Sequence, residues 1–235
     1  MKLSIIVPVY NEKNTILKIL KKIEDVNFNS LAFTKEIIIV DDGSTDGTRE
    51  ILDKFKNENN NENLKIVYHP KNKGKGFAIR TGIEYVSGDY IIIQDADLEY
   101  DPQDYKKLLE YALKNNAEVV YGSRRLGSPN RFSYLSFYFG GIFLTWVVNI
   151  IYGIRITDES TCYKLFKAKI LKDIPLKCEK FEFCPEVTAK IAKRKIKIHE
   201  VPINYYPRSN SEGKKIKWRD GMQALWVLIK YKFFD

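Results

Sequence analysis

Three acidic residues stand at alternate positions in one short stretch of the chain, Asp95, Asp97 and Glu99. In an extended segment, side chains at alternate positions point to the same side, so this spacing places three carboxylates together. Crowded carboxylates repel one another, and their burial without a partner is unfavourable. Mg²⁺ and Mn²⁺ bind such oxygens and often keep open positions for phosphates. The alternative is a solvated acidic turn leading to a helix that is capped by Asp101 and begins at Pro102.

Apolar runs predict the strands that position these and other polar residues. Branched apolar side chains dominate five runs, which are residues 3–10, 36–40, 64–68, 90–93 and 118–122. Helical patterns separate the runs, including one that we expect over residues 12–24, capped by Asn11. Strands and helices that alternate in this way predict an α/β fold, with a mostly parallel sheet flanked by helices.

Ligands of such sheets bind beyond the carboxyl ends of the strands. Four groups of residues lie at this edge, at or just after the ends of four predicted strands. They are Pro8-Tyr10-Glu12, Asp41-Asp42, Asp95-Asp97 and Ser123-Arg124. The glycines and lysines of residues 72–76 open another helix and predict an anion-binding cradle. The first turn lacks the Gly-x-Gly-x-x-Gly of dinucleotide-binding folds, and there is no P-loop, which argues against those two classes.

Length, net charge and cysteine content indicate which classes of partner the chain can bind. The 235 residues suffice for one large domain, and the net charge of +9 favours anionic partners. A basic nucleic-acid-binding module is one alternative, but nothing in the chain is typical of a recognition helix or an RNA-binding strand, so we expect no nucleic acid. The three cysteines lack the spacing of a zinc site and predict reduced thiols in the cytosol.

With these residues in view, the first half of the chain resembles the family-2 glycosyltransferases of the GT-A fold, a Rossmann-like fold. The matching segments, in the family's order and spacing, are residues 7–12, 40–48, 72–76 and 94–99. The likeness is greatest to dolichyl-phosphate mannose and glucose synthases and extends to about Tyr206. It implies one domain over residues 1–235, with a nucleotide-sugar-binding half (1–125) and an acceptor half (126–235).

The resemblance implies an inverting hexosyltransferase that uses Mg²⁺ or Mn²⁺ and moves mannose or glucose from GDP-mannose or UDP-glucose to a polyprenyl (dolichyl) phosphate. The family match also leaves open a soluble glycan or protein as acceptor. In related synthases the position of Glu99 is often glutamine, so this site is more anionic. Cys162-Tyr163 departs from the small–aromatic pair of mannose synthases, so the sugar stays open.

The resemblance also assigns roles to residues. The expected donor-binding residues are Pro8, Tyr10, Glu12, Asp41, Lys75, Asp95 and Ala96. The expected metal ligands are Asp97 and Glu99, with Asp95 beside them. The expected acceptor-phosphate residues are Arg124, Arg131 and Ser136. Asp97, Arg124, Arg131 and Asp158 are the expected catalytic residues, with Asp158 contacting the sugar or steering the acceptor.

Two later segments complete the expected site. A glycine-hinged basic loop after Tyr206 predicts a flap in which Arg208 and Lys214 contact the diphosphate, with a solvated charge run as the alternative. Residues 132–154 carry no charge and are long enough to cross a membrane. A crossing would separate Asp158 from Asp97, so we expect two interfacial helices bent near Gly140-Gly141, on the cytoplasmic face of a membrane. A buried helix pair or an oligomer interface is the alternative.

Overall fold

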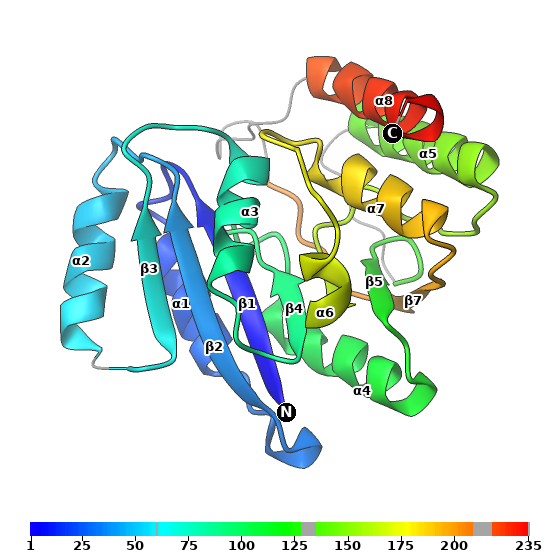
Figure 1. The fold of residues 1–235 in the computed structure, drawn as a ribbon. Coiled ribbons are helices and arrows are strands. Elements are labelled where there is room, and N and C mark those ends of the chain that lie inside the picture. The colour runs from blue at the N-terminus through cyan, green and yellow to red at the C-terminus, as the bar shows by residue number, and fades with distance from the viewer. Residues whose placement is uncertain (60, 128–134, 209–217, 235) are drawn as a thin grey trace.

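The structure is a computed structural model that describes residues 1–59, 61–127, 135–208 and 218–234. Within these residues one seven-stranded sheet has the order β3-β2-β1-β4-β6-β5-β7 (Figure 1). Its strands are β1 (Lys2–Val9), β2 (Thr34–Asp41), β3 (Leu64–Tyr68), β4 (Tyr90–Ile93), β5 (Val119–Ser123), β6 (Lys164–Lys167) and β7 (Ile198–Pro202).

The sheet is mostly parallel, as the sequence predicts. Strands β1, β2 and β4 are rich in isoleucine and valine and are buried almost throughout, which is typical of the centre of a parallel sheet. Strand β6 is antiparallel to both of its neighbours, β4 and β5. Strand β6 is not predicted by the sequence pattern, because it has four residues with a lysine at each end.

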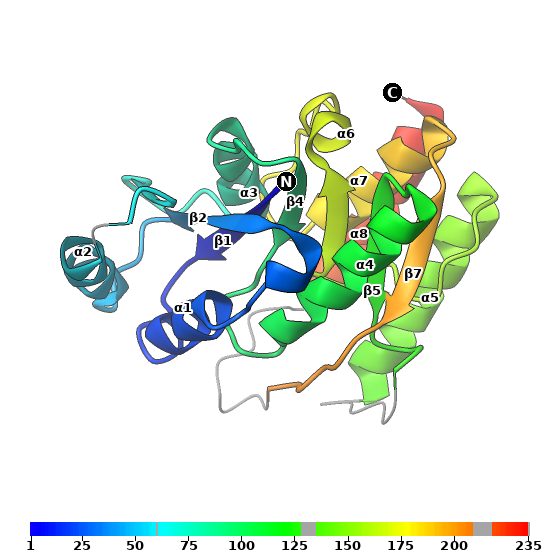
Figure 2. The ribbon, with the colours of Figure 1, turned by 90° about the horizontal axis from the view of Figure 1, so that it is seen from below.

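Helices cover both faces of the sheet, and α1 and α3 lie on opposite faces (Figure 2). The helices are α1 (Ile16–Glu24), α2 (Thr48–Glu58), α3 (Lys75–Glu84), α4 (Tyr105–Asn115), α5 (Leu135–Tyr152), α6 (Ala168–Lys172), α7 (Phe183–Lys193) and α8 (Trp218–Phe233), with short 3₁₀ helices at Asn29–Leu31 and Pro102–Asp104. The apolar side chains of α1, α3 and α4 join those of the strands in one core. The fold is therefore α/β, as expected.

Of the two predicted helix caps, one is confirmed and the other is wrong. Asp101 accepts a hydrogen bond from the amide of Gln103, and Pro102 begins the helical turn, so that prediction is confirmed. Asn11 is not the cap of α1, which begins at Ile16 after Thr15. Its side chain instead accepts a hydrogen bond of 2.8 Å from the amide of Thr45, which joins two loops at the carboxyl edge of the sheet.

The predicted bend at Gly140-Gly141 is wrong, because α5 is one helix from Leu135 to Tyr152. The hydroxyl of Thr145 donates to the carbonyl of Gly141, which is a contact along one continuous helix. Helix α5 packs beside α8, and both lie near α7 (Figure 1). No helix in the described part of the chain is long and apolar enough to span a bilayer.

Candidate functional site

The carboxyl edge of the sheet brings together the first two predicted donor-site residues. Lys75 opens α3, and Asp95 follows the end of β4. Their side chains form an ion pair of 2.5 Å, and about a quarter or less of each is exposed. Burial lowers the pKa of Lys75, but the Asp95 carboxylate outweighs it and raises that pKa above its ordinary value. Lys75 therefore remains a cation at this edge.

A second cation, Arg208, lies among the other predicted acidic residues. Its guanidinium is 3.0 Å from an oxygen of Asp97 and donates to both oxygens of Glu12, at 3.2 and 3.3 Å. Its backbone amide donates to Glu99 at 2.8 Å. Burial, Asp95 and Glu99 together raise the pKa of Asp97 to about 7. The fold thus brings Glu12, Asp97, Glu99 and Arg208 together, although they come from distant segments.

The expectation that the three carboxylates share one side of an extended segment is wrong. Strand β4 ends at Ile93, and Leu98 has a left-handed backbone with φ of 65°, so the segment turns. Asp95 then pairs with Lys75, Asp97 with Arg208, and Glu99 with the hydroxyl of Tyr205. Among the described residues, no three acidic, histidine or cysteine side chains form a group ready to hold a metal ion.

The donor set still fits a divalent ion that is shared with a diphosphate. Mg²⁺ usually takes one or two carboxylates and completes its shell with waters and substrate phosphates. Asp97 and Glu99 supply hard oxygens, and the Arg208 guanidinium beside Asp97 shows that this position attracts a cation. The residues therefore fit a shared ion, and a complete protein cage is absent from the described chain.

Four backbone amides in and beside the predicted anion cradle already have hydrogen-bond partners within the protein. The amides of Gly76 and Phe77 at the start of α3 donate to the carbonyls of Lys180 and Glu179, at 2.8 and 2.9 Å. The amides of Lys73 and Gly74 donate to the carboxylate of Asp42, at 3.0 and 2.7 Å. These four amides are already satisfied, so an anion at this segment would be attracted by its lysine side chains, Lys73 and Lys75.

The glycines of this segment serve a close approach of two chain segments. A Cβ on Gly76 would lie 2.9 Å from the carbonyl oxygen of Lys180, and one on Gly74 would clash with that of Glu179. Gly74 also has a φ of 100°, which residues with a side chain rarely adopt. Glycine is therefore required at these positions by close packing against residues 179–180.

Two hydrogen-bond networks lie at the carboxyl end of β2, around Asp41 and Asp42. The fully buried Asp41 accepts two hydrogen bonds from Arg49, at 2.8 and 3.1 Å. Asp42 lies 2.7 Å from His69, whose other ring nitrogen lies 3.0 Å from the hydroxyl of Thr81. The sequence analysis missed Arg49, since nothing in its spacing marks it as the partner of Asp41. His69 therefore bridges Asp42 and Thr81 inside the fold.

The remaining predicted donor residues are placed as follows. Pro8 lies in β1 opposite Val40, Tyr10 is partly buried just after that strand, and Ala96 is buried beside Asp95 and Asp97. Arg131 and Lys214 lie outside the described residues. Ser136 lies in α5, in the part whose side chains are not described.

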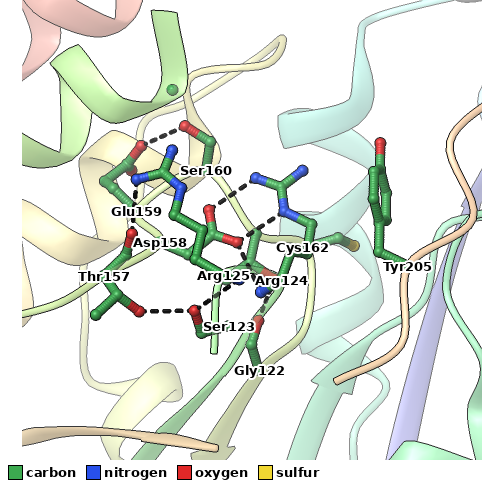
Figure 3. Close-up of polar contacts among 12 residues, drawn as sticks. Gly122, Ser123, Arg124, Arg125, Thr157, Asp158, Glu159, Ser160, Cys162 and Tyr205 are labelled. Carbon is green, nitrogen blue, oxygen red and sulfur yellow. Dashed lines mark hydrogen bonds and ion pairs between the residues drawn. The ribbon is translucent and has the colours of Figure 1, made fainter. Parts of the chain in front are cut away.

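Arg124 and Asp158 form a buried pair at the carboxyl end of β5 (Figure 3). The guanidinium donates to both oxygens of the fully buried Asp158, each at 2.7 Å, and the Arg124 amide donates at 3.0 Å. Burial raises the pKa of Asp158, but Arg124 outweighs it and holds that pKa below its usual value. Asp158 is thus committed to Arg124, which makes it a positioning residue in this state.

Two neighbours complete this cluster, and the sequence analysis missed both roles. Glu200 on β7 accepts hydrogen bonds from the amides of Thr157 and Asp158, at 2.7 and 3.1 Å, and so fixes their loop. Arg125 donates to the carbonyl of Thr157 at 2.7 Å on the other side of Asp158 (Figure 3). Its guanidinium lies 5.8 Å from the ring of Tyr138 on α5.

An exposed apolar face lies next to this cluster, on α5 and α8. Phe139, Phe143, Trp146 and Ile150 follow a spacing of four, three and four residues, so they share one side of α5. Each is at least half exposed. On α8, Met222, Trp226 and Phe233 are exposed as well. Because α5 and α8 pack together, this helix pair carries exposed apolar side chains on both of its helices.

Comparisons with known proteins identify the family of the chain. The family model described as "Glycosyl transferase family 2" matches residues 4–175. The low-salt glycan biosynthesis hexosyltransferase Agl6 of Haloferax volcanii is 30% identical over 92% of this chain, which spans 51% of that protein. The dolichyl-phosphate beta-glucosyltransferase ALG5A of Trichomonas vaginalis is 30% identical over 99% of this chain and 73% of its own length.

The fold also matches a solved structure. Glucosyl-3-phosphoglycerate synthase from Mycobacterium tuberculosis, determined with Mn²⁺, UDP and phosphoglyceric acid, superposes with a TM-score of 0.71 at 17% identity. The superposition covers 100% of this chain and 79% of the other. At that identity the likeness concerns the fold, and it confirms the expected architecture.

Proposed function

The chain belongs to glycosyl transferase family 2 and is a glycosyltransferase, and we propose that it transfers a hexose from a nucleoside diphosphate sugar to a polyprenyl phosphate. One observation carries the choice of a lipid acceptor. A polar site rich in paired cations and carboxylates lies on the same molecule as an exposed apolar face, and Arg125 connects the two by its contact with Tyr138. A lipid phosphate requires both kinds of surface.

The donor lies, in this proposal, over the carboxyl ends of β1, β2 and β4. Pro8, Tyr10, Glu12 and Asp41 form the region that holds the base and ribose, with Asp41 buried behind it, while Lys75, Asp95 and Ala96 lie beside the diphosphate. Arg208 and Lys214 contact the phosphates from the acceptor half, residues 126–235. A divalent ion at Asp97 and Glu99 would neutralise charge that develops on the leaving diphosphate. GDP-mannose and UDP-glucose both suit such a site.

The transfer itself requires positioning more than proton transfer. An oxygen of the acceptor phosphate attacks the anomeric carbon, the bond from that carbon to the diphosphate breaks, and the electron pair leaves with the nucleoside diphosphate. The attacking oxygen is already ionised near neutral pH, so a strong base is unnecessary, and the configuration inverts. Arg124, Arg131 and Ser136 orient the acceptor phosphate. Asp158 supports this step by holding Arg124.

We further propose that α5 and α8 rest on the cytoplasmic face of a membrane. Trp146 and Trp226 are more than half exposed, and tryptophan suits the level of lipid headgroups. Lys230 and Lys232 near the end of α8 add positive charge that anionic lipids attract. The polyprenyl tail then stays in the bilayer while its phosphate reaches the edge of the sheet.

Two assays test the proposal. Thermal shifts with GDP, UDP and their sugars, with and without Mn²⁺, identify the donor, because a ligand that binds the folded state raises the melting temperature. Incubation with the labelled donor and a polyprenyl phosphate should then give product in the organic extract. Asp97→Ala should retain the fold and lose transfer. Label that appears only on a soluble glycan or protein would reject the lipid acceptor.

A further inference from the structure

The guanidinium of Arg208 lies against Asp97, one of the two carboxylates at which the proposed function places a divalent ion. It contacts the carboxylates of Glu12 and Asp97, at 3.0 to 3.3 Å, and the carboxylate of Glu99 holds its backbone amide. Burial lowers the pKa of Arg208, but Asp97, Glu12 and Glu99 each raise it, and the net pKa lies above its ordinary value. Arg208 therefore stays a cation among these acids. The side chain is 16% exposed, so these contacts lie largely out of water.

The backbone next to Arg208 is joined to residues 99–100 by contacts that do not involve the Arg208 side chain. The amide of Tyr206 donates to the carbonyl of Glu99 at 2.8 Å, and Tyr100 and Tyr205 form an antiparallel bridge. The rings of these two tyrosines lie 5.2 Å apart, and the Tyr205 hydroxyl donates to Glu99. None of these contacts uses the guanidinium. The Arg208 side chain can therefore leave the carboxylates while its backbone remains docked.

A guanidinium and a divalent ion cannot share the same carboxylate oxygens. At such short distances two cations repel strongly, and each also needs the lone pairs that the other uses. Without a cation, Asp97 would face Asp95 and Glu99 with no nearby counter-charge of its own. The carboxylates thus require one cation in either state, and the donor's phosphates offer the guanidinium a second partner.

We propose that Arg208 is a positioning residue that occupies the divalent-ion site in the donor-free enzyme and excludes the ion until a donor arrives. The inference rests on the proposed function, because it takes the metal position from there. A diphosphate accepts the guanidinium, which frees Asp97 for the ion that the diphosphate brings. Ion and donor then bind together, and the ion alone binds weakly.

Direct Mn²⁺ binding to the full chain, without any nucleotide, tests this exchange. Free Mn²⁺ is followed by electron paramagnetic resonance in titrations of the wild type, Arg208→Gln, Arg208→Lys and Arg194→Gln. Arg194 is an exposed arginine at the end of α7, so its variant controls for lost charge. We expect Arg208→Gln to bind Mn²⁺ about tenfold or more tightly than the wild type, while Arg208→Lys and Arg194→Gln stay near the wild type.

A second variant covers a failure of Arg208→Gln to fold. Glu12→Gln weakens two contacts of the guanidinium and leaves the predicted metal ligands intact, so it should also raise Mn²⁺ affinity, by several-fold. Affinity that is equal to or below the wild type in both folded variants overturns the exchange and leaves the proposed function standing. Absence of Mn²⁺ binding in every variant, even with UDP and GDP present, overturns the exchange together with the metal position that the proposed function gives to Asp97 and Glu99.

Discussion

Replacing Gly76 by alanine separates two explanations of the glycine-rich segment before α3. A phosphate cradle predicts lost nucleotide binding with little change in stability. The structure predicts lost stability, because the new Cβ would lie 2.9 Å from the Lys180 carbonyl oxygen and 3.1 Å from two atoms of Cys178. The backbone of residues 178–180 would have to shift, and Gly76 has an ordinary φ, so the effect comes from packing.

The magnitude follows from three contributions. Overpacking costs about 1–3 kcal/mol, and weakening the hydrogen bond from the Gly76 amide to Lys180 costs about 0.5–1.5 kcal/mol. Alanine returns about 0.5–1 kcal/mol, since glycine is unfavourable in a helix. The net loss is about 2 kcal/mol, which lowers the melting temperature by roughly 4–8 °C for a chain of this size.

Thermal unfolding measures the effect, and Gly140→Ala is the matched control. Gly140 also lies in a helix, α5, but a Cβ there meets nothing within 4 Å. Its variant should keep or slightly raise the melting temperature. If Gly76→Ala melts like the wild type and no longer binds UDP or GDP, the packing explanation is refuted and the cradle is restored.

Three further predictions concern the buried pair, the acid limb of stability and the apolar face. Asp158→Ala should lower the free energy of unfolding by up to about 3 kcal/mol in urea titrations, because it leaves the largely buried Arg124 without its carboxylate partner. Burial raises the pKa of Glu186, but hydrogen bonds from Lys190, Tyr231 and the amide of Lys177 outweigh it and hold that pKa below the unfolded value. The resulting stability is present above about pH 4.3 and is lost as pH falls, so Glu186→Gln should show a flatter loss of stability between about pH 6 and 3. Trp146→Ser should weaken co-sedimentation with anionic vesicles by about tenfold, with an unchanged melting temperature.

Each of these three has a control or a contradicting outcome. The double variant Arg124→Ala/Asp158→Ala should lose less than the sum of the single losses, and strict additivity would contradict a coupled pair. An unchanged acid limb in Glu186→Gln would contradict the depressed pKa. Tyr85→Ser alters an exposed aromatic residue that follows α3, so equal loss of vesicle binding in that variant would remove the assignment of the apolar face.

The sequence predicts those site residues that directly follow a strand of the sheet. Asp41 and Asp95 follow buried apolar runs, and parallel strands bring their carboxyl ends to one edge whatever the details of packing. Strand β6 escaped prediction, because a four-residue segment is recognised by its neighbours β4 and β5 more than by its own pattern. The bend at Gly140-Gly141 failed for a related reason, since glycine permits a bend without imposing one.

The sequence by itself determined the α/β alternation, the family and the list of charged residues at the carboxyl edge, because periodicity and motif spacing are local properties of the chain. The tertiary structure alone decided the partners: Arg208 with Asp97, Lys180 with the amide of Gly76, and Arg124 with Asp158. These partners are separated by tens of residues to more than a hundred. A charge carries no mark of its partner in the sequence, so the folded backbone selects among many cations and carboxylates by distance and burial.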